Sequence, residues 1–254
     1  MNRGINMKIS IITATYNSAA TVKDTLASVQ QQDYPDIEHI IVDGGSVDNT
    51  LEIVSGFPHI AKVISEKDKG IYDAMNKGVT LATGSVIGIL NSDDIYTDPT
   101  VLSTIAEVFR DPRVMTCYAD LQYVHPDNLD RTIRTWKSGP FKRRNFYNGW
   151  MPPHPTFFVR TEVYDDVGLF NLDLRSAADY EIMLRILLKH GLSSHYIPQV
   201  IVKMRAGGMS NASFANRLRA NKEDRLAWKL NDLRPHFFTL YMKPIRKITQ
   251  FIIK

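Results

Sequence analysis

The chain has 254 residues, of which 44% are hydrophobic and 23% are charged, and its formal net charge is +4. These values are typical of an ordinary globular chain with enough apolar material for one large core. No apolar run approaches the ~18 residues that a membrane-spanning helix needs. The single cysteine, Cys117, excludes an internal disulfide, and no apolar signal region follows Met1, so we expect a cytoplasmic protein.

The positive charge is concentrated near the C-terminus. Residues 217–254 contain ten Lys or Arg against three Asp or Glu, a balance of +7, which leaves −3 for residues 1–216. We therefore divide the chain into a main domain, residues 1–216, and a basic C-terminal extension, residues 217–254. Nucleic-acid binding is not expected, because the main domain is slightly acidic and contains no recognised nucleic-acid module.

The extension mixes basic residues with aromatic ones such as Trp228, Phe237 and Tyr241. This mixture is typical of helices that rest on an anionic membrane surface, which would make the protein peripheral to the inner face of the cell membrane. The alternative is a helical extension that packs its apolar face on the main domain.

Strand and helix patterns alternate along the first half of the chain. Short apolar runs predict strands at residues 8–13, 37–42, 60–65, 86–90 and 114–118. Apolar residues at helical spacing predict helices at residues 18–32, 46–54, 71–81 and 100–110. Such alternation implies right-handed crossovers and a mostly parallel sheet with helices on both faces. The predicted fold class is therefore α/β, with a doubly wound sheet.

Beyond Tyr118 the pattern is looser. Residues 123–155 contain two tryptophans, five prolines and a basic cluster, which predict irregular or antiparallel structure over the open end of the sheet. Loops in that position often determine substrate specificity. Further along the chain we expect a strand at 156–159, a helix at 179–189 and a last short strand at 195–198.

Two adjacent acids, Asp93 and Asp94, follow the buried strand at 86–90. The carboxyl ends of such strands are where α/β sheets bind ligands, and the repulsion between paired carboxylates has to be offset by a cation. Oxygen ligands suit Mg²⁺ or Mn²⁺, which takes its remaining ligands from water and substrate phosphates. The sequence thus predicts a divalent metal holding a phosphorylated ligand. The alternative is an exposed turn before a helix capped by Asp98.

Two other predicted strands also end in polar residues. The first ends in Thr13-Ala14-Thr15-Tyr16-Asn17 and the second in Asp43-Gly44-Gly45-Ser46, so one cleft can collect both with the acidic pair. Asp43 can accept a ring N–H from a base such as uracil or guanine, and Tyr16 can offer its ring face. The chain contains neither a P-loop nor a Gly-x-Gly-x-x-Gly after the first strand, which argues against those two nucleotide sites.

Five motifs, in this order and spacing, give the chain a resemblance to a known family. They are Ser10–Asn17, Ile41–Ser46 with Asp48, Ser65–Gly78, Asn91–Asp94 and Ala177–Tyr180. The chain resembles the inverting family-two glycosyltransferases with the GT-A nucleotide-diphospho-sugar fold, and among them those that assemble bacterial surface polysaccharides. The resemblance covers roughly residues 7–210.

The resemblance implies an enzyme that moves a single sugar from a nucleotide-diphospho-sugar, preferably a UDP-sugar, to a hydroxyl of a saccharide or lipid-linked saccharide acceptor. Asp179 would be the catalytic base, and Asp94 with Asp93 would hold Mn²⁺ or Mg²⁺ at the pyrophosphate. The residues implied in donor binding are Thr13, Thr15, Tyr16, Asn17, Asp43, Asp68, Lys69, Asn76, Ser92 and Asp93.

Three positions depart from the family pattern. Asn91 stands where an Asp-x-Asp motif often begins, so Asp94 would carry more of the metal binding. Ala178 replaces the acid that often precedes the catalytic aspartate. Met75 replaces an arginine that contacts phosphate, and Lys69 is the expected substitute.

Two further segments resemble family features. His154 matches a histidine common near the acceptor side of related transferases, although a structural role is the alternative. Arg205–Ser210 resembles a Gly-Gly-x-Ser segment whose backbone amides would close over the pyrophosphate, with a plain turn as the alternative.

Two other functions share parts of this pattern. A sugar nucleotidyltransferase would need a glycine-rich basic loop after the first strand, and Ala14–Ser18 has neither glycine nor base. A catalytically inactive protein that binds nucleotide sugar or scaffolds a complex would not need Asp43, Asp94 and Asp179 together. A transferase is therefore the favoured interpretation.

Overall fold

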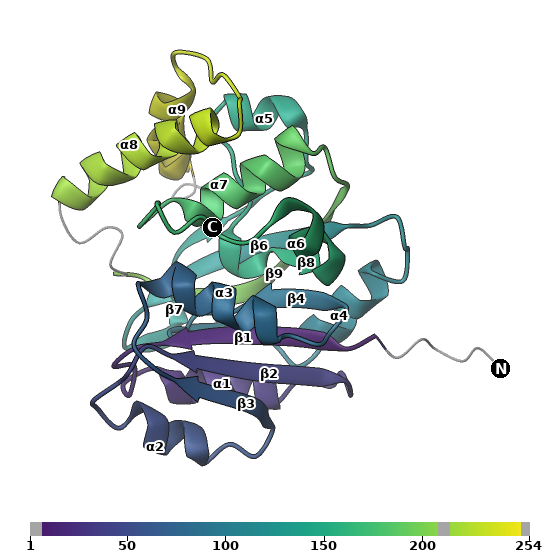
Figure 1. The fold of residues 1–254 in the computed structure, drawn as a ribbon, viewed down its shortest axis with the longest axis vertical. Coiled ribbons are helices and arrows are strands. Elements are labelled where there is room, and N and C mark those ends of the chain that lie inside the picture. The colour runs from purple at the N-terminus through teal and green to yellow at the C-terminus, as the bar shows by residue number, and fades with distance from the viewer. Residues whose placement is uncertain (1–6, 208–213, 250–254) are drawn as a thin grey trace.

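The structure, a computed structural model, describes residues 7–207 and 214–249. These residues form one nine-stranded sheet in the order β3-β2-β1-β4-β8-β6-β9-β5, with β7 beside β6 (Figure 1). The strands are β1 (Ile9–Thr15), β2 (Ile37–Asp43), β3 (Ile60–Ser65), β4 (Val86–Ile89), β5 (Asp94–Tyr96), β6 (Thr116–His125), β7 (Asn128–Trp136), β8 (Phe158–Arg160) and β9 (Ser194–Arg205).

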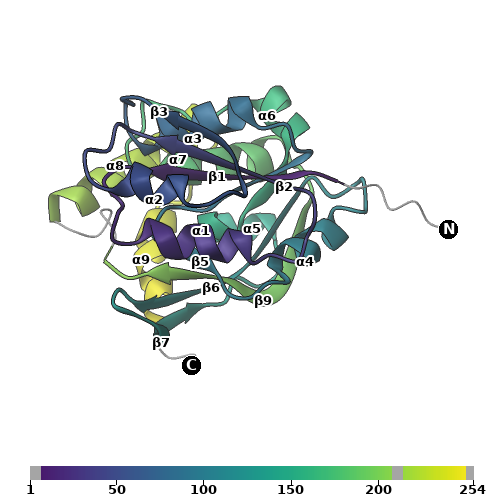
Figure 2. The same cartoon turned by 90° about the horizontal axis from the view of Figure 1, so that it is seen from below.

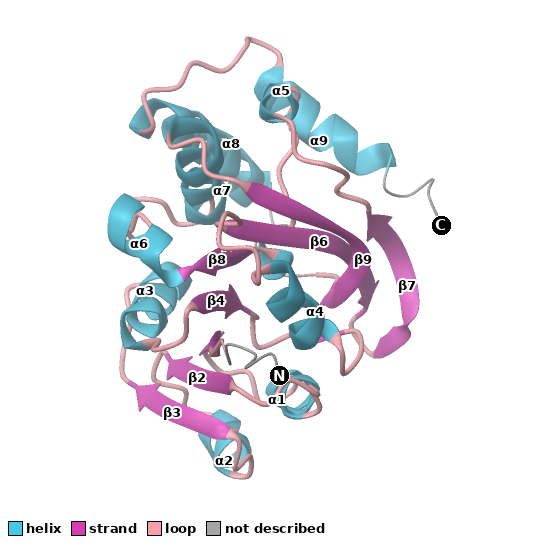
Figure 3. Ribbon diagram, turned by 90° about the vertical axis from the view of Figure 1, so that its right-hand side faces the viewer, coloured by secondary structure: helices cyan, strands magenta, loops and turns pink. Residues whose placement is uncertain are grey.

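Helices cover both faces of the sheet. They are α1 (Val22–Gln30), α2 (Thr50–Ser55), α3 (Ile71–Leu81), α4 (Val101–Val108), α5 (Arg143–Tyr147), α6 (Thr161–Val167), α7 (Ala178–Leu184), α8 (Phe214–Leu230) and α9 (Thr239–Thr249). Helices α3, α6 and α7 pack on one face, and α1 and α4 pack on the other (Figures 2 and 3). The predicted GT-A-like α/β layering is therefore present.

The two halves of the sheet differ in strand direction. The first half is parallel, because β1 pairs in parallel with β2 and β4, and β2 pairs in parallel with β3. In the second half only β6 and β9 are parallel, whereas β4–β8, β6–β8, β6–β7 and β5–β9 are antiparallel. The short β6–β7 connection can form only an antiparallel pair. The mostly parallel sheet predicted from the sequence thus holds for the first half alone.

The predicted segments match best where apolar residues repeat regularly. The strand at 60–65 and the helix at 71–81 have the predicted bounds. The last strand is longer than expected, because β9 continues from residue 194 to residue 205 along β6. The helix predicted at 179–189 begins one residue earlier and changes to a π-helical turn at 185–189.

The C-terminal helices pack on the main domain. Trp228 of α8 is fully buried in the same core as α3 and α7, and its Nε1 donates a hydrogen bond of 2.9 Å to the Tyr180 hydroxyl. In α9, the Lys243 ammonium pairs with Asp224 at 2.7 Å. This is the arrangement expected of a packed extension. Within residues 7–207 and 214–249, every helix is too short or too polar to cross a bilayer.

Candidate active site

A cleft of about 1050 Å³ opens beside the carboxyl ends of β1, β2 and β4. Ligands of open α/β sheets bind at this edge, where loops after neighbouring strands meet. Seven residues predicted from the sequence to bind the donor or act in catalysis line it: Thr15, Tyr16, Asn17, Asp68, Ser92, Asp93 and Asp179.

The loop after β1 forms one wall of the cleft. Tyr16 is 63% exposed, which leaves its ring free to stack on a base. Asn17 adopts a left-handed backbone (φ 48°), and its side-chain oxygen accepts a hydrogen bond of 3.0 Å from the amide of Val47. A Cβ at Gly44 would lie 2.5 Å from the Asp68 carboxylate, so a larger residue there would have to displace the Asp68 side chain. Contacts within the protein therefore hold this wall of the cleft in a defined position.

Asp43 does not face the cleft, contrary to our prediction. Its carboxylate is fully buried and accepts hydrogen bonds from the Thr15, Ser46 and Ser65 hydroxyls and from the amides of Gly45 and Ser46. Burial acts to raise the pKa of Asp43, but these hydrogen bonds outweigh it and lower the pKa. Asp43 therefore ties the ends of β1 and β2 together, and its contact with a base stays a prediction.

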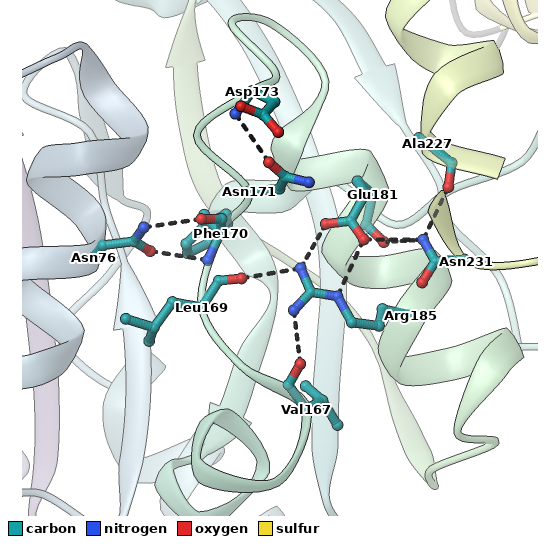
Figure 4. Close-up of polar contacts among 10 residues, drawn as sticks. All are labelled: Asn76, Val167, Leu169, Phe170, Asn171, Asp173, Glu181, Arg185, Ala227 and Asn231. Atoms are coloured by element: carbon teal, nitrogen blue, oxygen red, sulfur yellow. Dashed lines mark hydrogen bonds and ion pairs between the residues drawn. The ribbon is translucent and has the colours of Figure 1, made fainter. Parts of the chain in front are cut away.

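Three other predicted donor-binding residues also lie outside the cleft. Thr13 is fully buried two residues before the strand end, where its hydroxyl lies 3.0 Å from His39 Nε2. Both amide atoms of Asn76 are bonded to the main chain of Phe170 at 2.9 Å (Figure 4). Lys69 is not among the lining residues. The sequence motifs indicated the right segments, but none of these three side chains lines the cleft.

The two adjacent acids have different positions. Asp93 lines the cleft, whereas Asp94 begins β5 and is fully buried. Asp94 Oδ2 accepts a hydrogen bond of 3.4 Å from Asn91, and its Oδ1 is buried with no hydrogen-bond partner. Burial and the charge of Asp93 raise the pKa of Asp94 well above its ordinary value. Burial also raises the pKa of Asp93. Two acids are therefore held close together, and the nearby charge of Arg205 only partly offsets the rise in their pKa values.

This donor set fits a hard divalent cation that relies on other ligands. In the described part of the chain, no group of three or more His, Cys, Asp or Glu side chains could hold a metal ion. The protein's share would be Asp94, with its unpartnered oxygen, and Asp93. Mg²⁺ and Mn²⁺ commonly bind through one or two carboxylates plus water and phosphate oxygens.

Asp179 lies in the first turn of α7 with its side chain 21% exposed to the cleft. The Tyr72 hydroxyl donates a hydrogen bond of 3.1 Å to its Oδ1, and His154 Nδ1 lies 3.5 Å from its Oδ2. Asn91 Nδ2 lies 3.1 Å from His154 Nε2. An amide nitrogen only donates, so Nε2 accepts and we assign the ring proton to Nδ1, facing Asp179.

His154 thus connects the acidic pair with the predicted base. Burial lowers the pKa of His154 despite the nearby charges of Asp179 and Asp93, which keeps the ring neutral. Asn91 donates to both Asp94 and His154. The sequence suggested a place for His154 near the acceptor, but not its contact with the base.

Several lining residues were missed by the sequence analysis. Tyr72 lies inside a motif that we recognised, but only the packing of α3 against α7 brings it to Asp179. Lys67, Arg175 and Arg219 place three cations on the cleft wall, where we expected Lys69. Arg219 comes from α8, and its only signal in the sequence was the basic character of the C-terminal region.

Helix α8 also holds the loop that leads to α7. The Glu223 carboxylate accepts hydrogen bonds from the amides of Arg175 and Ser176 and from the Ser176 hydroxyl, at 2.7–3.1 Å. Two residues beyond Asp179, Glu181 accepts hydrogen bonds from Arg185 and from Asn231 (Figure 4). The predicted anion nest at 205–210 lies outside the described residues from Gly208 onward.

Residues 10–168 match the family model described as glycosyl transferase family 2. The chain belongs to this family. It is 30% identical over 207 residues to a PGL/p-HBAD biosynthesis glycosyltransferase of Mycobacterium tuberculosis, a match that covers 80% of this chain and 78% of the relative. The predicted family and the predicted enzyme class, a glycosyltransferase, are confirmed.

Solved structures support the same fold. TarS 1-349 of S. aureus in complex with UDP-GlcNAc matches with a TM-score of 0.71 and 19% identity, over 97% of this chain and 72% of that one. The match spans only 43% of the longer S. aureus TarS chain, with a TM-score of 0.67. The mannosyltransferase PcManGT of Pyrobaculum calidifontis, in complex with GDP-Man and Mn²⁺, matches with a TM-score of 0.65 and 21% identity, over 93% of this chain and 69% of that one. The predicted GT-A fold is confirmed.

Proposed function

We propose that this glycosyltransferase is a metal-dependent, inverting enzyme that moves one sugar from a nucleotide-diphospho-sugar to an acceptor hydroxyl. The main support is the meeting of Asp93, Asp179 and the exposed Tyr16 ring in one cleft. Donor-bound neighbours of the same fold, with UDP-GlcNAc in TarS and GDP-Man in PcManGT, also support a nucleotide-sugar donor.

The donor lies with its base against Tyr16 and its diphosphate near the three cations of the cleft. Tyr16 offers a stacking face, while Thr15, Asn17, Asp68 and Ser92 supply polar groups around the ribose. Lys67, Arg175 and Arg219 balance the phosphate charge that Lys69 was expected to meet. A UDP-sugar is the preferred donor in this proposal.

In this proposal Asp93 and Asp94 would hold Mg²⁺ or Mn²⁺. Such an ion, when bound, supplies Lewis-acid stabilisation of the charge on the departing nucleoside diphosphate. The unpartnered Asp94 oxygen and the raised pKa values of both acids support this role.

Asp179 accepts the proton of the acceptor hydroxyl. The acceptor oxygen then bonds to the anomeric carbon as the bond from that carbon to the phosphate oxygen breaks on the opposite side, which inverts the anomeric configuration. Tyr72 and the Nδ1–H of His154 hold the two carboxylate oxygens in place. The base therefore enters the reaction already oriented.

The acceptor in this proposal is an oligosaccharide or a lipid-linked saccharide used in cell-surface polysaccharide biosynthesis. The enzyme adds one sugar per encounter and works in the cytoplasm, on the inner face of the cell membrane. The basic C-terminal region supports a location beside anionic lipid.

The Asp179→Asn variant tests the assignment of the base. We expect sugar transfer to fall by about 10²- to 10⁴-fold, because the amide cannot take the proton. The Kd for the nucleotide, measured by calorimetry with Mn²⁺, should stay within about twofold, since the change is isosteric. Asp173→Asn, an exposed change in the preceding loop, is the matched control. Normal transfer by Asp179→Asn would refute the assignment.

A further inference from the structure

Helix α8 has one face against the core and the opposite face in solvent. Its buried side chains include Asp224, Ala227 and Trp228. Its exposed basic side chains follow at intervals of three or four residues: Arg219, Lys222, Arg225 and Lys229. Side chains at this spacing lie along the same side of a helix. The solvent face of α8 is therefore a basic stripe, which we define by these four residues.

Acidic residues do not neutralise this stripe. Glu223 bonds inward to the loop at Ser176, and Asp224 is buried against Lys243. Asp232 pairs with Lys189 at 3.1 Å. The three acids of the C-terminal region are thus engaged with other partners, while the cations of α8 remain exposed to solvent.

The turn between α8 and α9 continues the basic stripe and adds aromatic side chains. Arg234 is exposed there, Phe237 is 88% exposed and Tyr241, in the first turn of α9, is 60% exposed. A groove of about 410 Å³ in this region is lined by three cations, Arg225, Lys229 and Arg234, and by one acid, Asp232. Exposed rings beside several cations suit the boundary between lipid head groups and acyl chains.

We propose that Lys222, Arg225 and Lys229 of the basic stripe, together with the α8–α9 turn, bind the surface of a bilayer that contains acidic phospholipid. Acidic head groups would meet Arg225, Lys229 and Arg234, while Phe237 and Tyr241 would enter the interface. The two helices lie together at one end of the molecule (Figure 1), so one surface can engage both. The inference specifies the surface behind the proposed membrane location and does not depend on the identity of the donor or the base.

The same helix connects this surface with the active site. Arg219, at one end of the basic stripe, also lines the cleft, and Glu223 in the next turn holds the loop before α7. Membrane binding through α8 therefore brings the cleft to the lipid surface. A lipid-linked acceptor could then reach Asp179 without leaving the bilayer.

Vesicle co-sedimentation tests this inference with the full chain. We expect binding to vesicles of phosphatidylcholine with phosphatidylglycerol, but not to phosphatidylcholine alone. The charge-reversal variant Arg225→Glu/Lys229→Glu/Arg234→Glu should bind at least tenfold more weakly, because reversal replaces the attraction with repulsion. A matched control, Lys23→Glu/Arg110→Glu/Arg131→Glu, changes the net charge equally at exposed sites elsewhere and should bind as the parent does.

Three outcomes would overturn the inference: equal vesicle binding by the two triple variants, equal binding of the parent chain to neutral vesicles, or binding of soluble polyphosphate without vesicle binding. The circular dichroism spectrum confirms that each variant is folded. Vesicle binding needs no donor or turnover, so its failure is distinct from a failure of the proposed reaction.

A fluorescent reporter locates the contact more closely. In Phe237→Trp, emission should shift to shorter wavelength when acidic vesicles are added, because the indole enters a less polar medium. Val47→Trp places an indole at an equally exposed site, 89% exposed in the parent chain, and should show no shift. The same shift at both sites, or no shift at residue 237, would contradict insertion of the turn.

Discussion

The two sides of the active-site cleft satisfy their carboxylates in opposite ways. Beneath the wall formed by the loop after β1, both carboxylate oxygens of Asp43 accept hydrogen bonds from the protein itself. On the reaction side, Asp94 has an oxygen with no hydrogen-bond partner, and Asn91 has another. Buried polar groups are usually paired, so an unpaired set indicates a missing partner. The carboxylate of the first side is fully paired within the protein, whereas the second side leaves oxygens unpaired, where we propose that a divalent cation binds.

The largest expected effect comes from Asp94→Asn. Loss of the buried charge should reduce metal-dependent transfer by about a thousandfold, since the metal's electrostatic contribution is worth several kcal/mol. Without metal, the variant should be more stable than the parent by about 1 kcal/mol, because it no longer buries a repelled carboxylate. Steady-state transfer assays and urea unfolding measure the two effects. Asp165→Asn, at an exposed acid of α6, is the control.

The effect of Asp94 on the free energy of unfolding depends on pH with a definite sign. The folded-state pKa of Asp94 is raised, so its favourable contribution to stability is present at low pH and is lost as pH rises through the folded pKa. Urea unfolding without metal should therefore show less loss of stability with rising pH in Asp94→Asn than in the parent. If the free energy of unfolding depended on pH in the same way in Asp94→Asn and in the parent, the contrast between Asp43 and Asp94 would be wrong.

Asp43→Asn should change stability in the opposite direction. An amide cannot accept all of the hydrogen bonds that the carboxylate accepts, so we expect a loss of about 3 kcal/mol in the free energy of unfolding. Chemical denaturation measures this loss, with exposed Asp127→Asn as a control. If Asp43→Asn were neutral in stability and yet abolished nucleotide binding, the predicted base-reading role would be supported.

Glu38 extends the comparison to the other end of the strands. It accepts hydrogen bonds from Ser10 and Thr83 and pairs with Lys62. Burial acts to raise its pKa, but these partners lower the pKa to about 2. The contribution of Glu38 to the free energy of unfolding is present above the ordinary pKa of a glutamate and is lost as pH falls toward 2. Glu38→Gln should therefore cost about 2 kcal/mol at pH 7 and much less near pH 2, as urea unfolding at both pH values would reveal.

The smallest effect is expected for His154→Gln. Asp179 would lose the ring that holds its Oδ2, so we expect kcat to fall about tenfold with the donor KM unchanged. His154→Asn should also be less active than the parent, because its shorter side chain cannot span from Asn91 to Asp179. His236→Gln, at an exposed histidine, is the control. A rise in KM with constant kcat would instead place His154 in binding.

The sequence predicted the parallel half of the fold well, because regular apolar runs in β3 and α3 mark their own bounds. It was less successful for β9, whose buried and exposed residues do not alternate regularly. Within the site, the motifs identified segments but not side-chain directions. Asp93 and Asp94 look equivalent in the sequence, and only the pairing of β5 with β9 turns Asp94 inward.

Residues brought together by tertiary packing could not be predicted from local patterns. Asn76 belongs to a recognised motif, yet it bonds to Phe170, 94 positions further along the chain. Tyr72 and Arg219 reach the cleft through the packing of α3 and α8, which leaves no short-range signal. The family and the enzyme class were readable from the motifs, whereas the full set of residues that line the cleft was not.

The two N–H bonds of the Asn91 amide have a chemical consequence. One points to Asp94 and the other to the imidazole of His154. An aspartate at this position, as in the common Asp-x-Asp arrangement, has no proton to give to either neighbour. His154 would then lie between two carboxylates, which would favour an imidazolium with a proton on each nitrogen. Asparagine at position 91 therefore keeps the imidazole neutral and fixes its proton on Nδ1, the nitrogen that faces Asp179.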